Sequence, residues 1–255
     1  MPASVRAFSF HLLHYRRSWL GTAISYFVTP AMLLAALGLG FGALAADGRF
    51  AAVAGGYFGF LAPGLTAVVV VDAVAAEGMW RTYAGFNWDK AYLVQRQTPL
   101  SPGSMVAGHF LFMLVKALIV ASCFAVVAVL MRPAVAASVI GSIPAALLTG
   151  CAWGAVLMVV ALRFRSSAAF VPIQRLVLVP TTMLSGALFP VAVLPGWLQA
   201  VMLVNPSWHG VAAVRAVTGD PARPGSALIH LAVLAAICAV ALALAGRAMA
   251  HRLED

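Results

Sequence analysis

The sequence predicts an all-α integral membrane protein, and three observations support this fold class. Of the 255 residues, 63% are hydrophobic and only 9% are charged. A soluble domain is about one quarter charged, so this chain lacks the polar residues to cover a water-facing surface. Uncharged stretches long enough to cross a bilayer, which takes about 20 apolar residues in a helix, recur along the chain. These observations exclude a soluble globular domain, a disordered chain and a disulfide scaffold.

Uncharged runs place most of the membrane spans. Residues 18–46, 50–71, 133–162 and 224–246 carry no charge, and Lys116 alone interrupts residues 97–131. Residues 176–214 are too long for one span, and four prolines divide them. We therefore predict six transmembrane helices, at residues 22–44, 54–76, 104–130, 137–161, 171–189 and 227–247.

The distribution of basic residues predicts the orientation. Short cytoplasmic loops are enriched in Lys and Arg, and six spans put both termini on one side. Ten basic residues fall on the side of the termini and four on the other. The ten are Arg6, Arg16, Arg17, Arg81, Lys90, Arg96, Arg163, Arg165, Arg247 and Arg252; the four are Arg49, Arg132, Arg215 and Arg223. Both termini are therefore predicted to be cytoplasmic. The net charge of +9 then reflects cytoplasmic loops, and no nucleic acid partner is expected.

The segment before the first span predicts an amphipathic helix. Phe8, Leu12 and Tyr15 recur at helical spacing, while Arg16 and Arg17 lie off that stripe. A helix of this kind lies in the membrane interface, with its apolar face in contact with lipid and its basic residues near the headgroups. The alternative is a frayed polar tail.

Two connecting segments differ from ordinary loops. Residues 77–103, on the cytoplasmic side, mix aromatic and charged side chains, which suits a membrane interface or a docking surface for a protein. Trp80, Tyr83, Ala84 and Trp88 fit one helical face, and Ser101 followed by Pro102 is a suitable helix start.

Residues 189–223, on the outer side, are mostly apolar but are divided by prolines into stretches too short to cross. We expect two short helices near residues 194–204 and 207–217 that dip into the outer leaflet. Irregular backbone at that depth requires cover from protein or a watery cavity. An extra pair of spans is the alternative.

No enzyme active site is evident in the sequence. A Gly-Lys pair, needed for a phosphate-binding loop, is missing, and the zinc motif His-Glu-x-x-His does not occur. The seven acidic residues are scattered, and the three cysteines lack the spacing of metal ligands. We expect no catalytic residues, no metal and no cofactor bound by this chain.

Lys116 is a charge within a predicted span. It lies about 12 residues into the third span, which is about 18 Å along a helix and close to the middle of the bilayer. Asp72, near the inner end of the second span, is the expected partner. The two residues are candidates for a translocation path or an intramembrane ion pair; the alternatives are a snorkelling lysine or an ion pair that only fixes helix register.

Three stretches of the chain resemble the permease subunits of ABC-2 type exporters, above all the nodulation-factor (lipo-oligosaccharide) and daunorubicin-resistance branches. The first is residues 60–64 (Phe-Leu-Ala-Pro-Gly) with Asp72 and residues 77–81; the second is residues 98–102 with Gly108 and His109. The third is residues 184–190 followed by Leu194, Pro195, Trp197, Leu198, Asn205, Pro206, His209 and Arg215. The likeness covers nearly the whole chain as a single transmembrane domain, residues 1–255.

The resemblance implies a mode of action. In such exporters the loop between the second and third spans carries a coupling helix that docks on an ATP-binding subunit; here this corresponds to residues 86–96, with Asn87, Trp88, Asp89 and Lys90 as contacts. It also implies a second copy of the permease, two ATPase subunits that bind ATP and Mg, and a bacterial plasma (inner) membrane location. The implied substrate is amphipathic: a lipo-oligosaccharide, a glycolipid or a hydrophobic drug.

The aromatic residues are the one departure from the family pattern. They cluster in loops and at span ends, whereas long-polysaccharide exporters often line the channel with aromatic belts, so a long glycan fits less well. Two other functions remain open: a scaffold without transport, and a lipid-modifying membrane enzyme.

Overall fold

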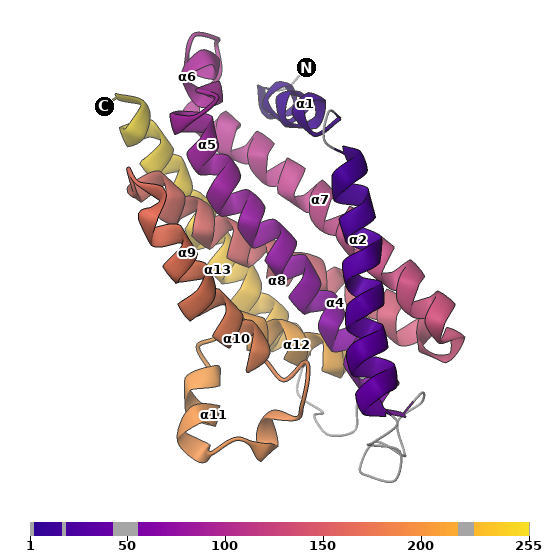
Figure 1. Ribbon diagram of the computed structural model, residues 1–255. Helices are drawn as coiled ribbons and strands as arrows, with labels where there is room; N and C mark the ends of the chain where they lie inside the picture. The colour runs from indigo at the N-terminus through magenta and orange to yellow at the C-terminus, as the bar shows by residue number, and fades with distance from the viewer. Residues whose placement is uncertain (1–2, 17–18, 43–55, 219–226, 255) are drawn as a thin grey trace.

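The computed structural model describes residues 3–16, 19–42, 56–218 and 227–254, and within these ranges the chain is helical without strands (Figure 1). Short π-helical segments, designated η, continue some of the helices. The elements relevant here are α1 (Ala3–Tyr15), α2 (Trp19–Leu33), η1 (Leu34–Phe41), α4 (Gly56–Ala76), η2 (Glu77–Arg81), α5 (Thr82–Asn87), α6 (Ala91–Arg96), α7 (Pro102–Met131), α8 (Ala136–Arg163), α9 (Phe170–Ile173), η5 (Gln174–Leu178), α10 (Val179–Met183), α11 (Gly196–Met202), α12 (Pro206–Val217) and α13 (Ala227–Glu254).

Five helical stretches in the described residues are long and apolar enough to cross a membrane. They are Leu20–Gly40, Gly56–Asn87, Pro102–Met131, Pro133–Arg163 and Ala227–Glu254. These correspond to the predicted spans one to four and six, which confirms the membrane fold class. Residues 43–44 of the first predicted span and 54–55 of the second lie outside the described residues.

The predicted fifth span is shorter in the structure than expected. Its helical part comprises α9, η5 and α10, of 4, 5 and 5 residues, and at 1.5 Å per residue it is about 21 Å long. The bilayer core is about 30 Å thick, so six spans are not established by length alone. The helix ends at Met183 with Leu184 as its C-cap, and the turn that follows contains Gly186 with a φ of +92°, a conformation that glycine tolerates.

The core of the bundle lies between α4 and α8. Gly150 and Gly154 on α8 face Val70 and Val74 on α4, and a Cβ on Gly78 would collide with the backbone oxygen of Gly154. The Gly150-x-x-x-Gly154 motif therefore serves contact within the chain, because small residues let two helix backbones approach closely. In contrast, only 17% of the α2 span and 17% of the α13 span are buried inside the chain.

The helices run between two ends of the bundle that carry different elements. One end carries α1, α5, α6 and the C-terminal end of α13; the other carries α11 and α12 (Figure 1). We name them the α6 end and the α12 end. The segment α9–α10 runs from the α6 end, where α8 finishes, toward the α12 end (Figure 1). Both described termini thus lie at the α6 end.

Candidate functional site

The candidate site is the turn between α5 and α6, at the tip of the longest helix in the described chain. The second predicted span was expected to end at residue 76, but the helix continues to Asn87 over 32 residues. The turn is fixed by side chains: Asn87 donates to the Tyr83 carbonyl, Arg81 pairs with Asp89, and Asp89 accepts from the Ala91 backbone N–H.

The four predicted contact residues of this segment are all exposed on the turn. Asn87 ends α5, and Trp88, Asp89 and Lys90 follow it with no helical structure. The indole of Trp88 is 63% exposed, which is unusual for so large an apolar side chain outside an interface. The expectation of one continuous helix over residues 86–96 is wrong. Lys90 takes a left-handed φ of 53°, and this separates α5 from α6.

An aromatic layer supports the turn from beneath. The Trp88 ring lies 6.4 Å from Trp80 and 5.7 Å from Tyr83, measured between centroids. Trp80 and Tyr83 in turn pack edge-to-face on Phe170 of α9, at 5.3 Å and 5.2 Å. The predicted shared face of Trp80, Tyr83 and Trp88 is confirmed, and it connects the turn to α9.

Buried polar side chains connect α6 to the spans. Tyr92 on α6 is 1% exposed, and its hydroxyl lies 2.7 Å from Nδ1 of the fully buried His109 on α7. The other ring nitrogen, Nε2, lies 3.6 Å from Oε1 of Glu77 in η2. The Lys116 ammonium donates to Oε2 of Glu77 at 2.7 Å. We name this series, Tyr92–His109–Glu77–Lys116, the polar relay.

His109 hydrogen bonds with Tyr92 through Nδ1, and its Nε2 lies near the Glu77 carboxylate without a hydrogen bond. If the Tyr92 hydroxyl donates to Nδ1, a neutral imidazole carries its proton on Nε2, which faces the Glu77 carboxylate. Burial raises the pKa of the Tyr92 hydroxyl well above its usual range, so that group remains a donor. His11 of α1 stacks on His109, with ring centroids 4.4 Å apart and planes 15° apart. The relay therefore joins α1, η2, α6 and α7.

The expected pairing of Lys116 with Asp72 is wrong, because Lys116 pairs with Glu77. Asp72 and Glu77 are five residues apart, which at about 100° per residue puts them on different faces of the helix. Asp72 faces outward and is exposed, and among the described residues no ion pair within 4.0 Å includes it. Sequence reasoning missed Glu77 by treating residue 77 as loop. Its signal was its position directly after the expected span end at residue 76, on a helix that continues past it.

An open groove lies between the turn and the relay. Its volume is about 480 Å³, and it connects the exposed Trp88 to the ion pair of Glu77 and Lys116. The lining residues are Ala76, Glu77, Trp80, Arg81, Ala84, Trp88, Asp89 and Lys116. Lys116 is thus accessible from the groove, with 14% of its side chain exposed.

Helix α1 lies across the α6 end and has two apolar faces. Ala7 and His11 are buried, and Ala7 packs on Gly108 of α7. The predicted stripe is a neighbouring face: Phe8 and Tyr15 are half-buried and Leu12 is 43% exposed. Arg16 is exposed, and Arg17 lies outside the described residues. The apolar stripe is therefore available for contact outside the chain.

At the α12 end, a buried arginine holds α12 against the bundle. The Arg215 guanidinium donates to the backbone oxygens of Phe60, Gly186 and Ala187, and its Cζ lies 3.6 Å above the Phe60 ring. Arg215 was counted among the outer basic residues and in the third family-like stretch, but this buried contact was not predicted. Asn205 caps α12 through Ser207 N–H and donates to the Thr181 carbonyl.

The described residues contain no group of three or more His, Cys, Asp or Glu side chains arranged to hold a metal ion. The relay contains one histidine ring and one carboxylate in direct reach of each other, and both are engaged in structural contacts. This arrangement links η2, α6 and α7 through side chains.

Comparison with known proteins identifies the family. A model described as ABC-2 type transporter matches residues 7–218. Nodulation protein J of Rhizobium meliloti is 29% identical over 231 residues, covering 90% of this chain and 85% of the relative. Nodulation protein J of Sinorhizobium fredii is 28% identical, covering 86% and 82%, and that of Neorhizobium galegae is 30% identical, covering 76% and 77%. No solved structure matches.

Proposed function

Because the chain belongs to the ABC-2 type transporter family, we propose that it is the permease subunit of an ATP-driven exporter in the bacterial plasma (inner) membrane. A separate ATP-binding-cassette subunit binds ATP and Mg and hydrolyses the ATP. The substrate is amphipathic: a lipo-oligosaccharide, a glycolipid or a hydrophobic drug. The family match carries the proposal, and the exposed Trp88 turn with the buried polar relay behind it supports docking at this place.

The turn provides a docking surface of suitable chemistry. An exposed indole among polar side chains is a frequent centre of protein interfaces, because it buries a large area with little loss of side-chain entropy. Asn87, Asp89 and Lys90 surround Trp88 and supply the polar rim. Arg81 and the α5 carbonyls already hold the turn, so little ordering would oppose docking.

The relay provides a route for movement. Separating buried polar groups from their partners costs free energy. A displaced α6 would therefore draw His109 and Glu77 along with Tyr92. Lys116, at the end of the relay, lies deep in α7. Closure of the ATPase dimer on ATP would in this way reach the spans and open a route at the interface between two permeases.

The membrane arrangement completes the proposal. We assign residues 170–183, with the irregular segment after them, to the fifth of six crossings. The reason is that α9–α10 runs from one end of the bundle toward the other (Figure 1). Helices α11 and α12 are re-entrant from the outer side. The α6 end is cytoplasmic, and α1 lies in the inner interface with Leu12 and Leu13, 43% and 64% exposed, toward lipid.

A second copy of the chain is part of the proposed assembly of two permeases and two ATPases. An exposed carboxylate on a spanning helix is costly in lipid, so Asp72 requires a protein interface or a watery path. The low burial of α2 leaves an apolar surface for such a contact. Asp72 and Lys116 thus remain the candidates for the translocation path, on separate helix faces.

The test co-expresses the full chain with each cassette ATPase of its host and measures copurification and ATP turnover. One ATPase should copurify with the chain, and its turnover should rise. The double variant Trp88→Ala/Lys90→Glu should reduce this stimulation at least tenfold, because it removes the exposed anchor and reverses a neighbouring charge. The free energy of unfolding should stay within about 0.5 kcal/mol of that of the parent chain, since both side chains are exposed.

The matched control is Trp197→Ala/Arg132→Glu, which alters an exposed tryptophan and an exposed arginine away from the turn. Copurification of the ATPase should be unchanged in this variant. Full stimulation in the Trp88 variant would sink the docking assignment. A chain that stimulates no ATPase would favour a scaffold without transport.

A further inference from the structure

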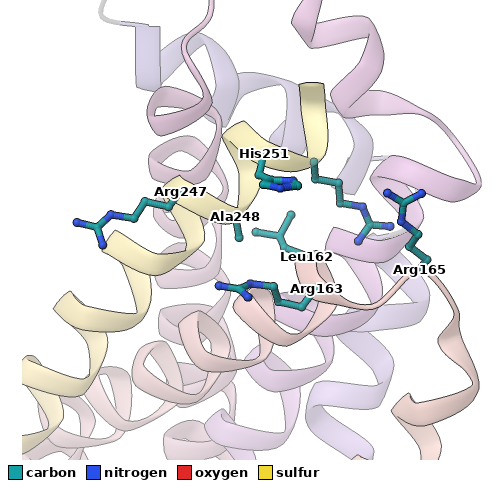
Figure 2. A pocket seen from close by; sticks show the side chains of 7 residues that line it. Leu162, Arg163, Arg165, Arg247, Ala248 and His251 are labelled. Carbon is teal, nitrogen blue, oxygen red and sulfur yellow. The ribbon is translucent and has the colours of Figure 1, made fainter. Parts of the chain in front are cut away.

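A basic pocket lies at the α6 end, where α8 and α13 finish. Its volume is about 320 Å³, and among the residues that the structure describes no acidic side chain lines it. Figure 2 shows Leu162, Arg163 and Arg165 from the end of α8 and the segment after it beside Ala248 and His251 of α13, with Arg247 at the rim and its side chain directed outward. Arg252 completes the lining. Four arginines and one histidine thus share one hollow.

The pocket is organised by contacts of Arg252. Its Nη1 donates to the backbone oxygens of Ala161 and Phe164, at 2.6 Å and 3.0 Å, and its Cζ lies 4.6 Å from the Phe86 ring centroid. These contacts fix the end of α13 against α8 and α5. The other lining arginines are therefore presented on a rigid frame, which reduces the entropy lost when a ligand binds.

The charge of the pocket indicates an anionic ligand. Arginines at the carbonyl ends of helices are favoured by the helix dipole, and this accounts for Arg163 and Arg252 individually. Arg165 and Arg247 add further positive charge at the rim of the pocket, on opposite sides of it. Guanidinium groups bind phosphate oxygens through paired, charge-assisted hydrogen bonds. A phosphate group therefore matches the charge of this lining.

The surroundings of the pocket favour a lipid over a soluble anion. Both helices that form it are candidate membrane spans, so their ends lie level with headgroups. Val240 and Leu244, 60% and 38% exposed, precede Arg247 at helical spacing and share its face of α13. An apolar track thus leads along the span directly to the basic pocket. Basic pockets between spans on the cytoplasmic side suit anionic headgroups.

We propose that this pocket binds the phosphate of an anionic phospholipid of the cytoplasmic leaflet, with an acyl chain along Val240 and Leu244. The proposal rests on the cytoplasmic orientation of the α6 end given above, and it concerns lipid recognition rather than transport. The bound headgroup would bridge the ends of α8 and α13, beside the α5–α6 turn.

The test titrates the delipidated full chain in nonionic detergent with phosphatidylglycerol or phosphatidylcholine of identical acyl chains, and native mass spectrometry counts bound lipid. Phosphatidylglycerol should bind at a concentration at least tenfold lower. Arg163→Gln/Arg247→Gln should abolish this preference, and Arg163→Lys/Arg247→Lys should keep most of it. The control Arg132→Gln/Arg175→Gln removes the same charge elsewhere and should retain the preference. No ATPase or transport enters the measurement, so its result is independent of the exporter proposal.

Several outcomes would overturn the lipid assignment. Equal binding of the two lipids would do so, as would an unchanged preference in the glutamine variant. Displacement of phosphatidylglycerol by inorganic phosphate at equal concentration would make the pocket a site for soluble anions. Loss of ATPase copurification in the glutamine variant, with its lipid preference intact, would instead assign the arginines to an acidic protein surface.

Discussion

At the α6 end, η2, α6 and α7 meet through the ionisable side chains of the polar relay, whereas at the α12 end Arg215 joins α12 to the bundle through backbone carbonyls, as Arg252 does for α13. The side chains of the polar relay contact one another and can exchange partners. They are Tyr92, His109, Glu77 and Lys116. Arg215 contacts carbonyl groups, whose positions are set by the backbone. The first arrangement can adopt alternative pairings, and the second keeps α12 in one place. The predictions below test this difference, from the largest expected effect to the smallest.

Arg215→Ala should cause the largest loss of stability. It leaves three buried carbonyl groups without their donor and removes the cation above Phe60, so the free energy of unfolding should fall by about 4 kcal/mol. Denaturant titration of the purified chain in detergent would measure this. Arg132→Ala, at an exposed position, should change the same quantity by less than about 0.5 kcal/mol. A similar effect for the two variants would show that Arg215 does not hold α12.

Exchanging charges in the relay should identify the true partner of Lys116. Lys116→Glu places two carboxylates together in a largely buried site, and the free energy of unfolding should fall by about 3 kcal/mol. Adding Glu77→Lys should recover most of that loss, while adding Asp72→Lys should recover none. Rescue by the Asp72 change, measured in the same denaturant titration, would restore the pairing expected from sequence.

Gly78→Ala should reveal how closely η2 approaches α8. The new Cβ would meet the backbone of Gly154, which cannot move like a side chain, so about 2 kcal/mol of stability should be lost. Gly103→Ala is the matched control, because no atom lies within 4 Å of a Cβ there. Thermal unfolding of the two variants should differ clearly. Equal midpoints would mean that the helices separate at little cost.

Tyr92→Phe and Tyr57→Phe compare one hydroxyl at each end. Tyr57 donates to the Leu188 carbonyl at 3.0 Å, and Tyr92 hydrogen bonds with His109 at 2.7 Å. Each change should cost about 1 kcal/mol of stability. Only Tyr92→Phe should also lower the stimulation of ATPase turnover by the chain. Equal stimulation in both variants would remove the relay from the proposed coupling route.

The sequence was sufficient to predict the spans that are long and uncharged, and Ser101 caps α7 as expected, accepting from the Ser104 N–H. Long apolar runs report membrane depth directly, so four spans were predictable from uncharged runs, and the third from a run that only Lys116 interrupts. The fifth was placed too long because its apolar composition continues past Met183, where the helix ends. The contact residues of the α5–α6 turn rest on family likeness and stay a prediction.

The partner of Lys116 could not be predicted from spacing in one helix, because it depends on how far α4 continues and on its rotation against α7. Charge alone suggested Asp72, because it lies nearer than Glu77 to the membrane depth expected for Lys116. The residue that binds Lys116 had been assigned to a loop, since a carboxylate normally marks a span end. Likewise His11 and His109 lie 98 positions apart in the chain numbering and meet only because α1 folds back across α7.

The π-helical segment η2 has a consequence for how this surface tolerates sequence change. A π-helical stretch accommodates an additional residue within an otherwise α-helical run. Deleting one residue between Glu77 and Arg81 would remove this additional residue and return the run to α-helical geometry, with little rotation of the helix beyond it relative to α4. Deleting one residue from the α-helical turns of α5 would instead rotate everything beyond the deletion by about 100°. The Trp88 turn would then point elsewhere while every side chain on it was retained. A one-residue deletion should therefore be tolerated better in η2 than in α5.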